Sequence, residues 1–194
     1  MITRTAEDCT APLAKYVGNA ICCPQFKSML QIFKGEHSFI SNSLVLNDSD
    51  ALECIAEIMS VLIENGANTS ITELCNIQPT NMTGGLCPVT SVKKFEQMID
   101  TNKLLNACAI VDPLTECCNA ICQPAITDAA VRLSSNSSTL NLQQLVNDCE
   151  GIVYAWLARE LGPEVSISAF RILYNCKVNQ GTSQNWNINH NISG

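Results

Sequence analysis

Twelve of the 194 residues are cysteines, and their type and spacing allow more kinds of chemistry than those of any other residues of the chain. Thiols can form disulfides, hold a metal ion, or act in redox and nucleophilic chemistry. An even number is what a closed set of disulfides requires. The twelve are Cys9, Cys22, Cys23, Cys54, Cys75, Cys87, Cys108, Cys117, Cys118, Cys122, Cys149 and Cys176. We predict that they form disulfides, and the pairing stays open because twelve cysteines allow about ten thousand arrangements.

The spacing of the cysteines argues against a metal centre. A tetrahedral zinc site takes ligands at short spacing from each of two places. The chain has no CxxC pair, and its two histidines lie far from any cysteine pair. Cys117, Cys118 and Cys122 are close enough to offer three thiolates, and only the pair Cys22 and Cys23 stands out as a second half. Disulfides account for this pattern better, and we predict no metal ion and no cofactor.

Catalysis also lacks its usual signatures. A nucleophilic cysteine would need a free thiol beside a base, and among the histidines only His37 is a plausible base. We place His37 in a loop. The motifs of serine hydrolases, zinc proteases, P-loop proteins and dinucleotide-binding proteins are absent. We therefore predict no catalytic residue and no enzymatic activity.

The composition places the chain among folded proteins that do not bind nucleic acid. Lys and Arg number 11 against 18 Asp and Glu, which gives a net charge of −7. Phosphate binding needs clustered basic residues, so nucleic acid is excluded as a partner. Hydrophobic residues make up 46% of the chain, which is enough to bury a core rather than remain disordered.

Five N-x-S/T motifs point to the same oxidising, extracellular compartment that the cysteines indicate. Each lies outside the strongest helical patterns, where a glycan could be attached. The candidate glycosylation sites are Asn47, Asn68, Asn81, Asn136 and Asn191. A polar loop that happens to contain Asn and Ser is the plainer reading of each motif.

The hydrophobic periodicity is helical nearly throughout, and no strand alternation appears. One apolar stripe predicts a helix over 50–64, with Asp48 or Ser49 as its cap and Gly66 at its end. Its members are Leu52, Ile55, Met59 and Leu62. We predict an all-α, disulfide-crosslinked helical domain with long loops.

Three further stripes place a cysteine among core residues. They are Leu145, Cys149, Ile152 and Trp156, then Val165, Ala169, Ile172 and Cys176, and finally Leu114, Cys118, Ile121 and Ala125. Sulfurs in such positions tie one helix to the next, which is a structural role. Adjacent helical residues point about 100° apart, so Cys22 and Cys23 should reach different partners, as should Cys117 and Cys118.

Loops and ends are visible in the composition. Residues 76–88 are rich in turn formers and predict a long surface loop, and 134–138 form a polar break. From residue 179 the chain is mostly Asn, Gln, Gly, Thr and Ser, and we predict a disordered tail over 179–194. No secretory leader and no membrane-spanning run is recognisable. Since a disulfide-rich chain needs an entry signal, we expect this chain to be a fragment or a shortened gene model.

Several segments, in order along the chain, resemble the SPARK domain of plants. They are Val17 to Gln25, Cys75 to Thr83, Leu86 to Val89, Asp112 to Ala130 and Asn175 to Lys177. This resemblance covers 9–178, so we divide the chain into a SPARK-like cysteine-rich helical domain at 9–178 and a divergent tail at 179–194. Relatives of this type start with a signal peptide and carry further cysteines beyond both ends.

The resemblance implies a non-enzymatic extracellular protein, held by a GPI anchor on the outer face of the plasma membrane. It implies an interaction or co-receptor module whose partners are receptor-like kinase ectodomains or other cell-surface proteins. Membrane contact would come only through a lipid anchor that this chain does not contain. The alternative is an extracellular carrier of a lipid or other small apolar ligand, because small disulfide-linked helical proteins can enclose an apolar tunnel.

Overall fold

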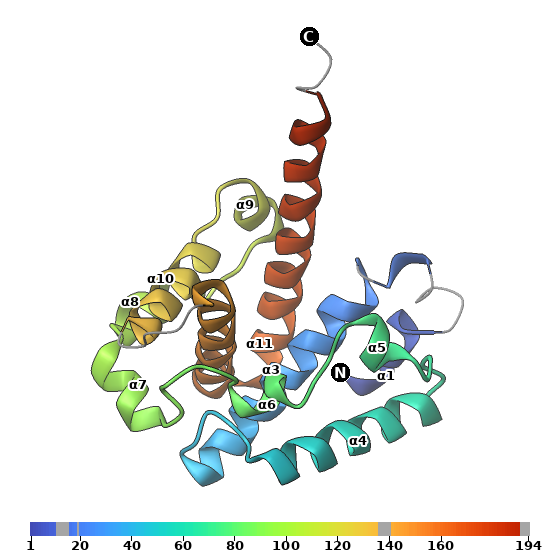
Figure 1. Cartoon of the computed structure of the whole chain (residues 1–194), viewed down its shortest axis with the longest axis horizontal. Coiled ribbons are helices and arrows are strands. Elements are labelled where there is room, and N and C mark those ends of the chain that lie inside the picture. Colours follow the sequence, from blue (N-terminus) through green and yellow to red (C-terminus); the bar gives the residue numbers. More distant parts are fainter. Residues whose placement is uncertain (11–15, 19, 136–140, 191–194) are drawn as a thin grey trace.

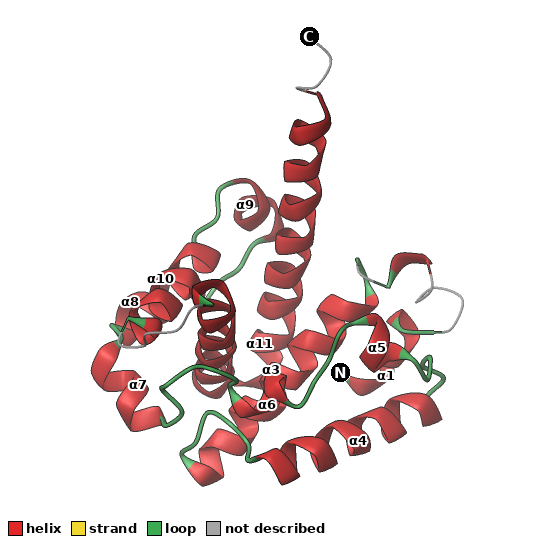
Figure 2. Cartoon of the chain, in the orientation of Figure 1, coloured by secondary structure: helices red, strands yellow, loops and turns green. Residues whose placement is uncertain are grey.

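The computed structural model describes residues 1–10, 16–18, 20–135 and 141–190, with side chains described as far as Lys177. Within these ranges all regular secondary structure is helical and no strand occurs, which confirms the predicted all-α class (Figure 2). The helices are α1 (Ile2–Asp8), α3 (Cys22–Ser41), α4 (Asp48–Glu64), α5 (Ile71–Leu74), α6 (Thr80–Thr83), α7 (Val92–Met98), α8 (Thr101–Cys108), α9 (Pro113–Cys118), α10 (Cys122–Ser134) and α11 (Leu142–His190) (Figure 1).

Helix α11 is a hairpin of two helical arms. Gly162 has φ 73° and ψ 166°, and Pro163 follows it. A left-handed glycine ends a helix without steric cost and proline favours the first turn of the next one, so the chain reverses here. The ring of Tyr154 stacks on that of Tyr174 with centroids 5.0 Å apart, and Glu150 pairs with Lys177, farther from Gly162 on both arms, so the arms run antiparallel. Figure 1 shows them side by side, with the second arm leading toward the C-terminus.

Helix α3 crosses this hairpin at very short distance. A Cβ atom at Gly35 would lie 2.5 Å from Cβ of Ala158 and 2.8 Å from the backbone nitrogen of Arg159. Only a residue without a side chain allows the two backbones to approach so closely. The α3–α11 contact is therefore set by a glycine in the middle of a helix.

We expect Gly35→Ala to lower the free energy of unfolding by about 1–2 kcal/mol, although the same change in an exposed helix interior stabilises by about 1 kcal/mol. The reason is overpacking against the backbone of α11. Urea unfolding followed by circular dichroism measures the change. Glu36→Ala, at the exposed neighbouring position, is the matched control and should have little effect. A stabilised Gly35→Ala variant would contradict the close crossing.

The apolar side chains form two core clusters. One joins α7, α8 and α10 to both arms of α11 and to Ile32 of α3, and it contains Trp156, whose ring stacks on Phe95 with centroids 5.0 Å apart. The other joins α1, the first half of α3, and α4, and it contains Phe26 and Leu62. Because α3 contributes to both clusters, it connects the two halves of the fold.

Five disulfides connect these helices, and all twelve cysteines lie in the described residues. The pairs are Cys9–Cys22, Cys23–Cys75, Cys87–Cys149, Cys108–Cys122 and Cys117–Cys176. The adjacent residues Cys22 and Cys23 have different partners, as their angular separation on a helix predicts. Burial of Cys149 and Cys176 agrees with their predicted places on core stripes.

Two cysteines depart from the prediction of a complete disulfide set. Cys54 and Cys118 are unpaired. The predicted core stripe through Cys118 is wrong because the segment is two helices, α9 and α10, rather than one. The residue of α9 that is buried is Glu116, whose carboxylate accepts hydrogen bonds from the backbone N–H groups of residues 121–123. This capping of α10 turns the Cys118 face of α9 toward solvent, and Leu114 is 83% exposed.

The two thiols should differ in reactivity. Cys118 is exposed, whereas Cys54 is half-buried and its pKa is raised by burial and then by the charge of Glu57. Because the thiolate is the reactive form, we expect a maleimide to label Cys118 about tenfold or more faster than Cys54 in the native protein. Peptide mass spectrometry at timed quenches measures both rates. Cys118→Ser should remove the fast reaction, and a native protein without any reactive thiol would contradict the assignment.

Other local predictions are confirmed or corrected by the helix positions. The helix expected over 50–64 is α4, capped by Asn47 rather than by Asp48 or Ser49. Leu52, placed on its buried stripe, is 58% exposed. His37 lies in α3 and not in a loop.

The ends of the predicted loops and domain also compare with the helix bounds. The loop expected over 76–88 contains α6, which buries Met82. The polar break at 134–138 begins where α10 ends, and its last residues lie outside the described ranges. Helix α11 continues across the predicted boundary at 178 to His190, and residues 191–194 lie outside the described part. The domain limits and the disordered tail therefore stay predictions.

Candidate functional site

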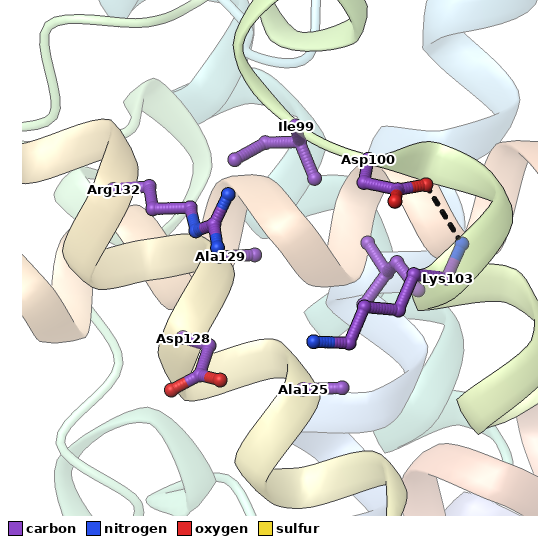
Figure 3. Close-up of a pocket in the computed structure, with 8 residues that line it drawn as sticks. Ile99, Asp100, Lys103, Ala125, Asp128, Ala129 and Arg132 are labelled. Carbon is purple, nitrogen blue, oxygen red and sulfur yellow. Dashed lines mark hydrogen bonds between the residues drawn. The ribbon is translucent and has the colours of Figure 1, made fainter.

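Two polar hollows are open at the surface. The first lies between α8 and α10, with a volume of about 180 Å³. Figure 3 shows the Lys103 ammonium and the Arg132 guanidinium extending into the space between the two helices. Asp100 and Asp128 complete its charged lining.

The α8–α10 hollow has no charge or polar group left without compensation. All four charged residues are exposed, and two acids balance two bases. The Asp100 carboxylate caps α8 by accepting the backbone N–H of Lys103 at 3.0 Å. Solvated charges of this kind contribute little binding energy, so we place the candidate site elsewhere.

The second hollow, called here the α3–α11 groove, runs between α3 and both arms of α11. It consists of two adjoining spaces of about 210 and 550 Å³ that share much of their lining. The residues common to both are Lys27, Asn147, Glu150, Tyr174 and Lys177. The Cys23–Cys75 disulfide forms part of the rim, so the wall of the groove is covalently held.

Lys34 lies beneath this groove with 1% of its surface exposed. Its Nζ donates to the backbone oxygens of Asn81 and Gly151, each at 3.2 Å. Burial lowers the pKa of Lys34 to about 7, and the charge of Asp148 offsets only part of this effect. Lys34 therefore joins α3, α6 and α11 from below and does not reach a ligand.

The acidic groups of the groove are already engaged. Glu150 forms an ion pair with Lys177 and accepts a hydrogen bond from the Thr127 hydroxyl. Asp148 accepts from the backbone N–H of Leu86 and from the side-chain amide of Gln144, both at 2.8 Å. The charge of Glu150 is thus neutralised by Lys177, whereas Asp148 keeps its negative charge and is held by two neutral donors.

Two polar groups of the groove, the Lys27 ammonium and the Oε1 of Gln31, lack a hydrogen-bond partner among the described residues. Lys27 forms no ion pair or hydrogen bond among the described residues, and its pKa is lowered by burial and then by the like charge of Lys177. Gln31, one helical turn further on, is 7% exposed and its Oε1 is buried without a partner. A buried acceptor without a donor costs free energy, so such a group is often completed by a ligand or water.

Sequence reasoning did not find this site. Lys27, Gln31 and Lys34 are spaced i, i+4 and i+7, which places them on one face of a helix. A polar face of this kind indicates exposure to solvent, because nothing in the local pattern shows that a distant hairpin covers it. The usable signal was Gly162-Pro163, which marks a helix reversal and hence a second wall.

Three of the five glycosylation candidates lie in the described residues. Asn47 and Asn81 are exposed and Asn68 is half-buried. Asn136 and Asn191 lie outside the described residues. Asn81 also lines the groove, so a glycan there would stand at its edge. Glycosylation stays a prediction at all five positions.

An apolar hollow of about 300 Å³ lies beside Cys54, between α1, α3 and α4, with Ile2 and Phe33 in its lining. Among the described residues, no group of three or more His, Cys, Asp or Glu side chains is placed to hold a metal ion. The described helices also include none that is long and apolar enough to cross a membrane.

These features define a disulfide-crosslinked, all-helical domain with a polar groove between its two central helices. Residues 1–150 match the family model described as SPARK, and the chain belongs to this family, as its sequence resemblance predicts. It is 37% identical over 182 residues to an uncharacterized GPI-anchored protein of Arabidopsis thaliana, covering 93% of this chain. The chain spans 42% of the length of that relative. No solved structure matches the chain.

Proposed function

We propose that the chain is a non-enzymatic interaction module of a plant cell-surface protein, with the α3–α11 groove as its binding site. The similarity to a GPI-anchored relative supports an extracellular location, as do the five disulfides, which persist in oxidising compartments. The observation that carries the proposal is the groove itself, in which Lys27 and the buried Oε1 of Gln31 have no partner within the part of the chain that the structure describes.

A recognition role suits this groove better than a catalytic one. General acid–base or nucleophilic catalysis needs a reactive group within hydrogen-bonding reach of its activator. In the groove the carboxylates are held by protein donors, and Lys34 is covered. What remains accessible is the Lys27 ammonium, a cation without a hydrogen bond or ion pair among the described residues, which is suited to binding a partner.

The test is binding of the full chain to a panel of purified plant receptor-like kinase ectodomains, measured by biolayer interferometry. We expect saturable binding to a subset of the panel. A Lys27→Met, Gln31→Leu double variant should weaken it about tenfold or more. Lys94→Met, at an exposed position on α7, is the control and should bind as the unmodified chain does. Binding that is unaffected by the double variant would exclude the groove.

The alternative of an apolar-ligand carrier is tested in the same series, because the hollow beside Cys54 is apolar. Saturable binding of a fluorescent fatty acid, lost in an Ile58→Asp variant of that hollow, would favour the carrier. The proposed module predicts no saturable binding of this probe.

A further inference from the structure

We propose that the α3–α11 groove binds an acidic side chain, Asp or Glu, together with an adjacent backbone N–H of a partner polypeptide. This inference rests on the proposed function and names the chemistry that the site recognises.

Lys27 supplies a positive charge to the groove that no counterion among the described residues neutralises. Of the two lysines in the groove, Lys177 is neutralised by Glu150, and the like charge of Lys27 adjoins this pair. Lys27 is half-buried, so water screens its charge only partly. A carboxylate placed beside Lys27 would gain a charge-assisted hydrogen bond.

The side chain of Gln31 has an acceptor that can still receive a hydrogen bond. Burial raises the pKa of Tyr174, and the side-chain amide of Gln31 opposes part of this rise. The Gln31 Oε1 has no hydrogen-bond partner among the described residues, so it still needs an N–H or O–H donor. Lys27 and Gln31 are one helical turn apart on α3, which is the reach of a carboxylate and the N–H of the same or the next peptide unit.

The inner space of the groove, of about 210 Å³, has a lining that is partly apolar. Leu30 and Ile77 contribute apolar surface next to the polar groups, which suits the aliphatic stem and backbone of a peptide better than a bare inorganic anion. The chain as a whole carries a net charge of −7. Acidic partners are therefore repelled from most of its surface, and binding would be confined to the groove.

The experiment titrates the full chain, labelled with ¹⁵N, with the peptide acetyl-Gly-Asp-Gly-amide and follows backbone chemical shifts. The same titration with acetyl-Gly-Asn-Gly-amide removes the charge but keeps the shape and the N–H groups. Sodium acetate keeps the charge but removes the N–H groups. We expect saturable shifts at 27–31, 147–151 and 174–177 with the Asp peptide, and about tenfold weaker binding of the other two probes.

Variants assign the two halves of the site. Lys27→Met should abolish the preference for the Asp peptide over the Asn peptide, and Gln31→Leu should abolish the preference for the Asp peptide over acetate. Lys94→Met should change neither. Equal binding of the Asp and Asn peptides, equal binding of acetate, or shifts outside the groove would each overturn the inference.

The outcome is separable from that of the ectodomain panel. If an ectodomain binds and the double variant Lys27→Met, Gln31→Leu weakens it, while the two peptides bind equally, the groove remains the binding site and the acidic ligand class is wrong. If no ectodomain binds but the Asp peptide shows the expected preference, the ligand class holds and the co-receptor role is wrong.

Discussion

Replacing both Cys87 and Cys149 by alanine is expected to lower the free energy of unfolding by about 4 kcal/mol. This disulfide closes a loop of 62 residues, and both of its sulfurs lie in the larger core cluster. In the chain-entropy account, a crosslink stabilises by restricting the unfolded chain, and the restriction grows with the logarithm of the loop length. Alanine is chosen because serine would leave a buried hydroxyl group without a partner.

The internal comparison is the Cys108–Cys122 disulfide, which closes only 14 residues in the same core cluster. Its removal by alanine is expected to cost about 3 kcal/mol, roughly 1 kcal/mol less than removal of Cys87–Cys149. Guanidinium unfolding curves, analysed with their slopes, give both values. Equal losses, or a larger loss for the shorter loop, would show that local strain and packing outweigh loop entropy here.

The helical class follows from the sequence because apolar spacing reports directly on which face of a helix is buried. The stripe through Cys149 and Trp156 shows this well, since the first arm of α11 is covered on that face. Helix α4 was also predicted close to its true bounds, because a polar cluster before the apolar pattern and Gly66 after it mark its ends, although the cap is Asn47 and not Asp48 or Ser49. Local signals located both helices.

The predictions failed where a contact between two helices decides, whether the helices are neighbours along the chain or far apart. The stripe through Cys118 has helical spacing, yet Glu116 turns α9 by capping the next helix. A buried carboxylate that satisfies backbone donors is a tertiary feature, and apolar periodicity carries no information about it. The disulfide pairing has the same character, because Cys117 and Cys176 are adjacent only after the α11 hairpin has formed.

The groove combines both situations. Its α3 wall was readable as a row at i, i+4 and i+7, namely Lys27, Gln31 and Lys34. Its α11 wall depends on the reversal at Gly162, which brings Tyr174 beside Tyr154. Polar residues on a helix become a site only when a second element removes them from water, and the sequence pattern of one helix does not report that event.

As the pH rises from 7 to 9, the titration of Lys34 by itself is expected to raise the free energy of unfolding by about 2 kcal/mol. Burial lowers the pKa of Lys34 from 10.5 to about 7. Between these two values the unfolded chain carries the proton and the folded chain does not, so folding releases a proton and a higher pH favours it. Below pH 7 both states are protonated, and the cost of burying the charge is present in full.

The hydrogen bonds of Lys34 support this direction. A neutral amine has two N–H groups, and the backbone oxygens of Asn81 and Gly151 accept one each. The additional proton of the ammonium has no further acceptor among the hydrogen bonds of Lys34 in the described residues. Both N–H groups of the neutral form are therefore satisfied, whereas the extra charge of the ammonium form is offset only in part by the nearby charge of Asp148.

The measurement is the pH dependence of urea unfolding for the unmodified chain and for Lys34→Met. The substitution removes the two hydrogen bonds as well as the titrating group, so the comparison uses the slope against pH rather than the stability at one pH. Contributions from other groups, including Lys27, cancel in the difference between the two slopes. Lys93→Met, on the exposed side of α7, controls for the loss of one lysine and should keep the original slope. Parallel curves for Lys34→Met and the unmodified chain would show that Lys34 keeps its proton in the folded state.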